Sequence, residues 1–403
     1  MPSKVPDMLI LALARWDAPY SSTAFSLAKA LSKKQRVFLI DNPFTWKDFL
    51  RNNNQPNIKR RKNAWFRGND RVTTPLKDFP QLHICVAPLM LPINWLPKGK
   101  VYRFFARINQ SRMKRFIRKI QQKEAIDSFH FLNIFNPFYP LTKKDLSGAL
   151  SVSYYSVDKI SESVYIHKHG SYLEQELLES MDQVLATSTS LKEELNKRSP
   201  TEVRFLPNAA ETSFFQQAVE ADFDRPAIFG EKDQPVVLYV GAIGLRIDFD
   251  LLDKVVQAYP HFRFIFIGPK GNQYDAKLEK YEQVHFTGAI PQGQLLPYFQ
   301  HASAAIIPFK MNELTAAIYP LKIHEYLAAG LPVVSTSFST DIHAFKDEIF
   351  LAENHFNFGK LLNKAIQEDT KSFRLKRSTA SSMHSWDSRA SEFMVFLDYF
   401  TLG

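Results

Sequence analysis

Residues 312–336 read NELTAAIYPLKIHEYLAAGLPVVST, and this stretch predicts one helix followed by one strand. Pro320 suits the first turn of a helix, because its ring fixes φ near the helical value. Gly330 is placed to end that helix, and Pro332 prevents the helix from continuing. The apolar run from Val333 then predicts a short buried strand. The stretch therefore indicates one helix–strand step of a parallel α/β sheet.

Two charged side chains, Lys322 and Glu325, fall on this predicted helix. The start of a helix with a loop before it favours an anion, because the first N–H groups of a helix have no partner within it. Lys322 would add a positive charge for a phosphate, and Glu325 could accept hydrogen bonds from a ribose diol. The Thr315 hydroxyl and the amides of Tyr319 and Leu321 could line the same phosphate.

The motifs N-E-L-T, P-L-K and E-Y-L-A-A-G-x-P-V-V resemble the nucleotide-sugar site of family 4 glycosyltransferases. They look most like the type that assembles bacterial polysaccharides and teichuronic acid. The resemblance is strong over about residues 236–340 and mainly architectural over the first 210 residues. It implies an α/β fold with GT-B architecture, in which two Rossmann-like domains face each other across a cleft. It also implies that Glu325 binds the ribose of the donor.

Other predicted strand ends supply further donor-binding candidates, because ligands of open α/β sheets bind beyond the carboxyl ends of the strands. In the loop GAIGLRID, residues 241–248, Gly241 and Gly244 allow the backbone to approach a ligand, and Arg246 offers a fork for a diphosphate. The loops GPKGN and HFTGAI follow the next two strands and contain the remaining candidates, which are Gly268, Lys270, Thr287 and Gly288. Lys270 could touch phosphate or base, or belong to a plain turn.

A chain of 403 residues favours two domains, each with its own core. We expect an acceptor domain over residues 1–210, a linker over 211–235 and a donor domain over 236–384. The resemblance to GT-B enzymes implies that the aromatic helix predicted over 385–403 packs back on the first domain. Strands are predicted at 7–13, 36–41, 82–88, 127–135, 149–157, 183–188 and 202–207, and in the donor domain near 236–241, 262–267, 284–287, 304–308, 333–336 and 349–352. The Asn-rich residues 44–76 predict a long loop.

The positive charge is concentrated in residues 51–123, which contain 18 Lys or Arg and two acidic residues. Within this segment, apolar residues recur at helical spacing over 101–123, including Val101 and Phe104. Three interpretations stay open: a core-packing helix with a solvated face, adhesion to an anionic membrane together with Trp65 and Phe66, or a nucleic-acid patch. We expect no nucleic-acid partner, because no recognised module accompanies the charge.

The single cysteine, Cys85, excludes an internal disulfide and fits a reducing compartment. No uninterrupted apolar run is long enough to cross a bilayer. We therefore expect a cytoplasmic protein, and the membrane interpretation of the basic segment would place it on the inner face of the membrane.

The resemblance implies transfer of a sugar from a nucleotide-diphosphate sugar to an acceptor hydroxyl, with retention of the anomeric configuration. Arg246 and Lys322 are the catalytic candidates for stabilising the leaving diphosphate. Asp158 could contact the acceptor or handle its proton, or simply cap the following turn. Trp16 and Asp17 are candidates on the acceptor side, although Trp16 could equally pack at the domain edge. The acceptor would be a glycan or a lipid-linked compound.

We expect no cofactor and no metal, since no suitable Asp-x-Asp pair or tight His/Cys cluster is found. Two alternatives remain open. One is a GT-B sugar-nucleotide epimerase, although the candidate residues are poor in the acidic and histidine groups it needs. The other is a non-catalytic sugar-nucleotide-binding or scaffold protein, because Ala317 stands where many relatives carry a second glutamate.

Overall fold

The computed structural model describes residues 5–18, 22–68, 71–162, 166–319 and 321–400. The chain divides into two compact units. Unit 1 contains Met1–Pro207 and Arg389–Gly403, and unit 2 contains Asn208–Ser388. Each unit is built around its own mainly parallel sheet, as the sequence predicts for this fold class.

The sheet of unit 1 has, within the described residues, the order β3-β4-β2-β1-β5-β6-β7-β8. Neighbouring strands run parallel, except that β3 pairs antiparallel with β4 at the edge. Seven of these strands were predicted, and only the short β3 was missed. The strands are β1 (Asp7–Ala12), β2 (Val37–Ile40), β3 (Val72–Thr73), β4 (Leu82–Cys85), β5 (Phe129–Ile134), β6 (Ala149–Ser156), β7 (Gln183–Ala186) and β8 (Val203–Phe205).

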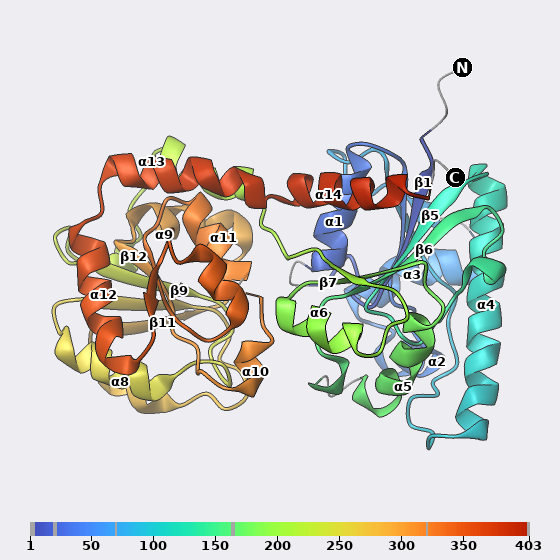
Figure 1. Ribbon diagram of the computed structural model, residues 1–403, viewed down its shortest axis with the longest axis horizontal. Coiled ribbons are helices and arrows are strands. Elements are labelled where there is room, and N and C mark those ends of the chain that lie inside the picture. Colours follow the sequence, from blue (N-terminus) through green and yellow to red (C-terminus); the bar gives the residue numbers. More distant parts are fainter. Residues whose placement is uncertain (1–4, 19–21, 69–70, 163–165, 320, 401–403) are drawn as a thin grey trace. The chain divides into compact units, whose positions relative to one another are not determined.

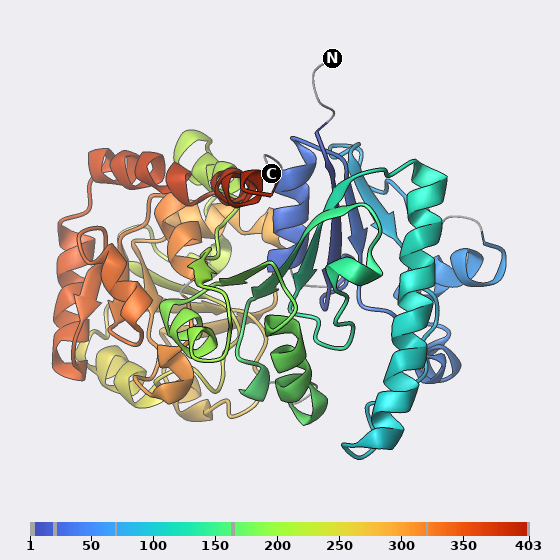
Figure 2. The ribbon, with the colours of Figure 1, turned by 45° about the vertical axis from the view of Figure 1, so that its right-hand side comes forward.

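Helices cover both faces of this sheet, and Figure 2 shows α1 and α4 on opposite faces. Because both faces are covered, strands such as β1 are buried along their whole length and read as continuous apolar runs. The helices are α1 (Thr23–Ser32), α2 (Trp46–Asn52), α3 (Pro56–Phe66), α4 (Lys100–Glu124), α5 (His167–Leu178) and α6 (Thr189–Asn196), with short 3-10 turns at Lys143–Asp145 and Ile160–Glu162.

The prediction of a long loop over residues 44–76 was wrong, because this segment contains α2 and α3. Thr45 and Asp48 form a capping box that starts α2. In α3, Ile58 is buried, and the indole of Trp65 donates a hydrogen bond to the carbonyl of Ala87 at 3.0 Å. Tertiary contacts therefore hold a helix whose sequence has little apolar periodicity. Trp65 packs against a small core formed by Phe44, Ile58 and Leu89, whereas Phe66 is 57% exposed.

The long helix α4 matches the predicted amphipathic helix, but its two halves differ. Towards its end, Met113, Phe116 and Ile117 are buried in the core of unit 1, as the core-packing interpretation predicts. Near its start, Val101 and Phe104 belong to the same predicted apolar face but are exposed. The helix thus packs along only part of its apolar face.

The sheet of unit 2 has the order β11-β10-β9-β12-β13-β14, and every pair of neighbouring strands in this described sheet is parallel. All six strands predicted for the donor domain are confirmed. They are β9 (Val236–Val240), β10 (Arg263–Ile267), β11 (Val284–Gly288), β12 (Ala304–Ile307), β13 (Val333–Thr336) and β14 (Phe350–Ala352).

Helices also flank the sheet of unit 2 on both sides (Figure 1). Helices α7, α9, α11 and α13 pack with one another, while α8 packs with α12 on the other side. The helices of unit 2 are α7 (Thr212–Glu220), α8 (Phe249–Ala258), α9 (Leu296–His301), α10 (Glu313–Ala316), α11 (Leu321–Ala328), α12 (His355–Gln367) and α13 (Lys371–Ala380). The last helix of the chain is α14 (Trp386–Asp398). Short 3-10 segments lie at Ala227–Phe229, Ala276–Lys280, Gln292–Gln294, Thr340–Phe345 and Ser381–His384.

The sequence suggested a linker over residues 211–235. In the structure these residues are part of unit 2. Their helix α7 packs against α9 and α11, and Phe215 and Phe229 are buried. At the other end, α14 begins at Trp386, and its residues from Arg389 onward belong to unit 1. No helix in the described ranges has the length and apolar character needed to cross a membrane.

Candidate functional site

The quoted stretch forms the step that its sequence predicts, with α11 followed by β13. Gly330 has φ of +75° beyond the helix end, a conformation that favours glycine. The buried Tyr326 ties α11 to the sheet, because its hydroxyl accepts a hydrogen bond from the amide of Val240 at 2.8 Å. This bond fixes the C-terminal half of α11 against the carboxyl end of β9. Pro320, the predicted first residue of the helix, lies outside the described residues.

Lys322 and Glu325 form an ion pair on the first turns of α11, with Nζ 2.8 Å from Oε2. The Glu325 side chain is 12% exposed and the Lys322 side chain 32% exposed. The carboxylate is therefore turned inward, while the ammonium group stays partly in water.

A cavity of about 350 Å³ opens beside this helix start. It is formed by the loops after β9 and β10, the end of β12 and the segment that leads into α11. Its lining residues are Tyr239, Gly241, Ala242, Gly244, Leu245, Arg246, Gly271, Asn272, Ile307, Phe309, Ile318, Tyr319, Leu321 and Lys322. Six predicted residues are thus brought together here, namely Gly241, Gly244, Arg246, Tyr319, Leu321 and Lys322.

The two glycine-containing loops at this cavity are joined through their backbones. The amide of Ile243 donates to the carbonyl of Pro269, and the amide of Gly271 donates to the carbonyl of Ile243, both at 2.9 Å. A β-carbon at Gly268, whose φ is +147°, would lie 1.9 Å from the carbonyl oxygen of Gly241. Gly268 therefore serves the close approach of the loops and does not itself line the cavity.

Arg246 is exposed at the cavity, and its backbone is fixed. The amide of Lys310 donates to the Arg246 carbonyl at 2.9 Å, and Ile247 pairs with Phe309 in an antiparallel bridge. The guanidinium group makes no hydrogen bond or ion pair with any residue in the described ranges. A rigid backbone that carries an unengaged guanidinium group suits the binding of an anionic ligand.

Thr315 was predicted as a phosphate ligand, and the structure contradicts this role. It is fully buried, and its hydroxyl donates to the carbonyl of Lys310. The same hydroxyl accepts from the amide of Asn312 at 3.2 Å, which completes a capping box at the start of α10. The side chain is therefore used in holding the loop, because a capping threonine satisfies backbone groups of its own helix.

The remaining donor candidates lie outside the cavity lining. Lys270 forms an ion pair with Glu279, and its Nζ lies 4.5 Å from the ring centre of Tyr274. The carbonyl of Gly288 accepts hydrogen bonds from the Gly268 amide and from the Thr287 hydroxyl, both at 2.9 Å. Lys270 and Thr287 therefore each have a partner within the protein, and their side chains contribute to the structure of the loops.

Sequence reasoning missed several lining residues, among them Tyr239 and Asn272. Tyr239 is buried, which raises the pKa of its phenol, and its hydroxyl donates to the carbonyl of Ala242 at 3.0 Å. His324 is buried on α11 outside the cavity lining, and its Nε2 lies 3.0 Å from the hydroxyl of the lining residue Tyr319. A tyrosine inside a buried strand and a histidine on a buried helix face carry no sequence signal that separates them from ordinary core residues.

The acceptor-side candidates in unit 1 are held by arginines. Both carboxylate oxygens of Asp17 contact Arg61, at 2.7 and 2.9 Å, and Arg60 adds a contact at 3.0 Å. Burial alone would raise the pKa of Asp17, but the hydrogen bonds and charge of Arg61, together with Arg60, lower it. Trp16 packs near Phe25 and lies beneath the Arg60 guanidinium. The carboxylate of Asp17 is thus engaged by arginines within unit 1, and Trp16 is half-buried beside them.

Asp158 is an exposed residue of the loop that follows β6. Its carboxylate accepts a hydrogen bond from the amide of Lys159 at 2.8 Å. This contact agrees with the turn-capping alternative. Among the described residues, no group of three His, Cys, Asp or Glu side chains is placed to hold a metal ion.

Residues 234–362 match the sequence model of a family described as glycosyl transferases group 1. The matched region lies within unit 2 and contains the cavity and α11. A comparison with curated proteins finds no match.

Solved structures with a similar fold include a sucrose-phosphate synthase from Thermosynechococcus elongatus, with 13% identity and a TM-score of 0.66 over 99% of this chain and 100% of that chain. A trehalose-6-phosphate protein from E. coli, bound with UDP-2-fluoro glucose, has 11% identity and a TM-score of 0.65 over 97% and 98%. A UDP-forming α,α-trehalose-phosphate synthase from Burkholderia vietnamiensis has 10% identity and a TM-score of 0.61 over 97% and 96%.

At these identities the structural likeness shows the fold alone, which is the two-domain GT-B architecture that the sequence predicts. Residues 234–362, within unit 2, are in addition similar in sequence to the family described as glycosyl transferases group 1. Together the two findings support a glycosyltransferase of GT-B fold.

Proposed function

We propose that this protein transfers a sugar from a nucleotide-diphosphate donor to an acceptor hydroxyl, and that unit 2 holds the donor. The observation that carries this proposal is the cavity that Arg246 and Lys322 share at the carboxyl ends of β9 and β12. Two cationic side chains and the first amides of α11 suit a diphosphate. Glu325, held by Lys322, is proposed to accept hydrogen bonds from the ribose.

The chemistry follows from the charge that develops on the leaving group. When the bond between the anomeric carbon and the diphosphate oxygen breaks, the electron pair stays on the diphosphate, which departs as part of a nucleoside diphosphate. Arg246 and Lys322 would lower the barrier by stabilising that charge. The acceptor oxygen then bonds to the anomeric carbon on the same face, and its proton passes to the leaving phosphate. This route retains the anomeric configuration and needs no metal.

The motif resemblance further suggests a hexosyl transfer to a glycan or lipid-linked acceptor in the assembly of bacterial surface polysaccharide or glycolipid, on the cytoplasmic side of the membrane. Asp158, on the exposed loop after β6 of unit 1, is proposed to contact that acceptor. Its carboxylate has one oxygen bound to a backbone amide, which would leave the other for an acceptor hydroxyl.

The test is to offer the purified protein a panel of nucleotide sugars and to follow release of nucleoside diphosphate. UDP-sugars and GDP-sugars come first, and EDTA is added in a parallel reaction. We expect release with at least one donor, unchanged by EDTA. Activity that disappears with EDTA and returns with a divalent cation would refute the metal-independent route.

Calorimetry with UDP and GDP separates the alternatives. Tight nucleotide binding without turnover of any donor would favour the non-catalytic scaffold, and epimerised donor recovered without transfer would favour the epimerase. Absence of binding to every nucleotide would overturn the proposed donor site itself.

A further inference from the structure

The start of α4 and the segment before it present large apolar side chains to solvent. Trp95 is 69% exposed, Phe104 61% and Val101 55%. Lys98 and Lys100 lie between them in the sequence and are also exposed. We call these five residues the collar. Large apolar side chains that are this exposed, on the start of one helix and the segment directly before it, indicate an interaction surface.

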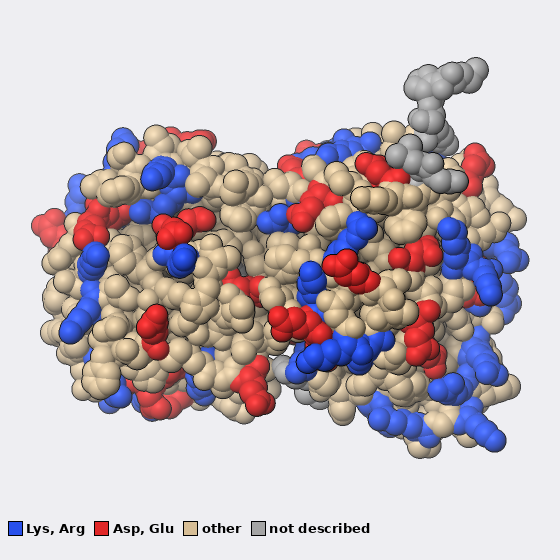
Figure 3. Space-filling model, in the orientation of Figure 1, with Lys and Arg blue, Asp and Glu red and all other residues tan. Residues whose placement is uncertain are grey.

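The collar is also a region of unbalanced charge. Residues 91–107 contain four Lys or Arg and no acidic residue, and of the four, Arg103 pairs with Glu176 of α5 at 3.2 Å. Lys98 and Lys100 make no ion pair with any residue that the structure describes. Figure 3 shows Lys and Arg side chains gathered over the part of unit 1 along which α4 runs. The natural partner of such a surface carries negative charge.

The backbone beneath the collar is firmly held. Lys168 donates a hydrogen bond to the carbonyl of Trp95 at 2.9 Å, and the ring of His169 stacks on that of Tyr102 with 3.7 Å between centroids. The collar therefore presents its apolar side chains from a fixed frame and would lose little conformational entropy on binding.

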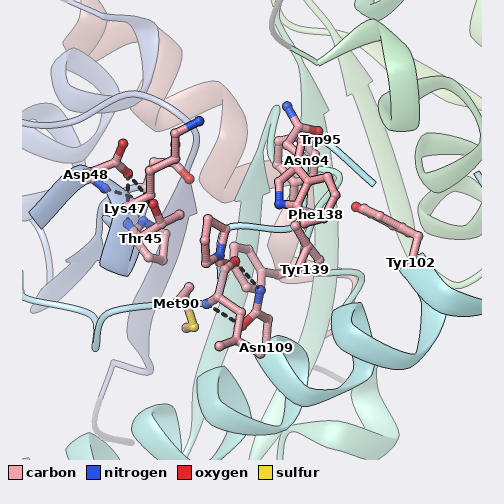
Figure 4. A pocket seen from close by; sticks show the side chains of 15 residues that line it. Thr45, Lys47, Asp48, Met90, Asn94, Trp95, Tyr102, Asn109, Phe138 and Tyr139 are labelled. Carbon is pink, nitrogen blue, oxygen red and sulfur yellow. Dashed lines mark hydrogen bonds between the residues drawn. The ribbon is translucent and has the colours of Figure 1, made fainter. Parts of the chain in front are cut away.

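A cavity of about 160 Å³ opens at the collar, and Figure 4 shows Trp95 and Tyr102 on one side of it and Lys47 and Asp48 on the other. Asn109 forms its floor, where the side chain exchanges two hydrogen bonds with the backbone of Leu91, at 2.9 and 3.0 Å. Trp95 belongs to both the collar and the cavity. A partner that binds the collar therefore lies at the mouth of this cavity.

We propose that the collar docks unit 1 on an anionic lipid surface, with Trp95, Val101 and Phe104 inserted among the lipids and the lysines against their headgroups. An apolar face bordered by basic residues and aromatic rings is the pattern that binds a membrane interface. Two copies of the collar would bring like charges together, so self-association is disfavoured. Nucleic acid would use the lysines but would leave the aliphatic Val101 without a partner.

The experiment is co-sedimentation of the full chain with phosphatidylcholine vesicles, with and without phosphatidylglycerol. We expect binding that depends on phosphatidylglycerol. The double variant Trp95→Ala/Phe104→Ala should lower the partition coefficient at least about tenfold, because two apolar anchors are lost. Lys98→Gln/Lys100→Gln should lower it about tenfold through lost headgroup attraction. All these residues are exposed, so the thermal midpoint should stay unchanged.

The matched control is Phe356→Ala/Lys360→Gln on α12, since Phe356 is 88% exposed and Lys360 is exposed beside it. This variant should bind vesicles as the wild type does. Equal binding of the collar variants and the wild type would overturn the proposal, as would wild-type binding without preference for phosphatidylglycerol. Two other results would also overturn the proposal if the wild type did not bind vesicles. One is that the wild type binds a single-stranded oligonucleotide and the collar variants do not. The other is that the wild type self-associates in sedimentation velocity and the collar variants do not.

Discussion

Lys322 and Glu325 lie one turn apart on α11, and their charged groups meet at 2.8 Å. The ion pair with Lys322 holds the Glu325 carboxylate in one orientation in the absence of a ligand. Because Lys322 also lines the cavity and Glu325 does not, the lysine connects the carboxylate to the proposed diphosphate site. The two residues should therefore act as one unit in nucleotide binding.

We expect Glu325→Gln and Lys322→Met each to weaken binding of the nucleoside diphosphate by about 1–3 kcal/mol, the cost of losing a charge-assisted hydrogen bond. Because each side chain positions the other, the double variant should lose less than the sum of the two. Calorimetry of the wild type and the three variants measures this coupling. Strictly additive losses would mean that the ion pair has no part in binding.

The stability of the same variants provides the control. The pair is partly exposed on the lysine side, so breaking it should lower the free energy of unfolding by less than about 1 kcal/mol. A much larger loss would indicate that weaker nucleotide binding reflects damage to α11 and not a missing ligand contact.

Arg246→Ala tests the diphosphate site directly. Its guanidinium contacts no described residue through a hydrogen bond or ion pair, so we expect an unchanged unfolding midpoint. Binding of a nucleoside diphosphate should fall by about 1.5–3 kcal/mol, and binding of the corresponding nucleoside much less. The matched variant is Lys254→Ala, which removes an exposed cation of α8 outside the cavity. Equal effects of the two substitutions would show that only overall charge matters.

The sequence predicted the strands of unit 2 well, because each is a buried apolar run bounded by turn residues. It failed over α2 and α3, since their residues are mostly polar and basic. The interactions that hold α3 are distant in sequence, as in the hydrogen bond from Trp65 to Ala87. Tertiary contacts of this kind override local pattern.

The sequence predicted only part of the donor site, because it shows which residues are unusual but not which partners they have in the fold. Arg246, Lys322 and the loop glycines were found, because charged and glycine residues after buried strands are unusual enough to notice. Thr315 and Lys270 were assigned to ligands because the sequence does not reveal their partners, Asn312 and Glu279. Tyr239 was missed because it lies within the continuous buried run of β9 and looks like another core residue.

A buried charge cluster in unit 1 gives a stability prediction. Arg61 is 2% exposed and binds Asp17 at 2.7 Å and Asp41 at 2.5 Å. Arg61→Met should lower the free energy of unfolding by about 3–5 kcal/mol, because two buried carboxylates lose their partner. Arg60→Met is the matched control. Arg60 contacts the same Asp17 but is 54% exposed, so its loss should cost less than about 1 kcal/mol. Urea unfolding measures both, and similar losses would contradict the assignment.

A pH prediction follows from His130 on β5, which is buried and whose Nδ1 lies 2.7 Å from Ser151 Oγ on the neighbouring strand. Burial lowers the pKa of His130 from 6.5 to about 4. Between these values the unfolded chain binds a proton at this position and the folded chain does not, so stability falls as the pH drops from 6.5 towards 4. The loss should reach about 2–3 kcal/mol at the acidic end.

The double variant His130→Leu/Ser151→Ala removes both hydrogen-bonding partners together, which avoids leaving a buried hydroxyl unpaired. Its urea midpoint should change less with acidification than that of the wild type, while the two proteins stay close at pH values well above 6.5. His261→Gln, at an exposed position in unit 2, should keep the full wild-type pH dependence. If the double variant lost stability with falling pH as steeply as the wild type, His130 would not be the group whose protonation opposes folding.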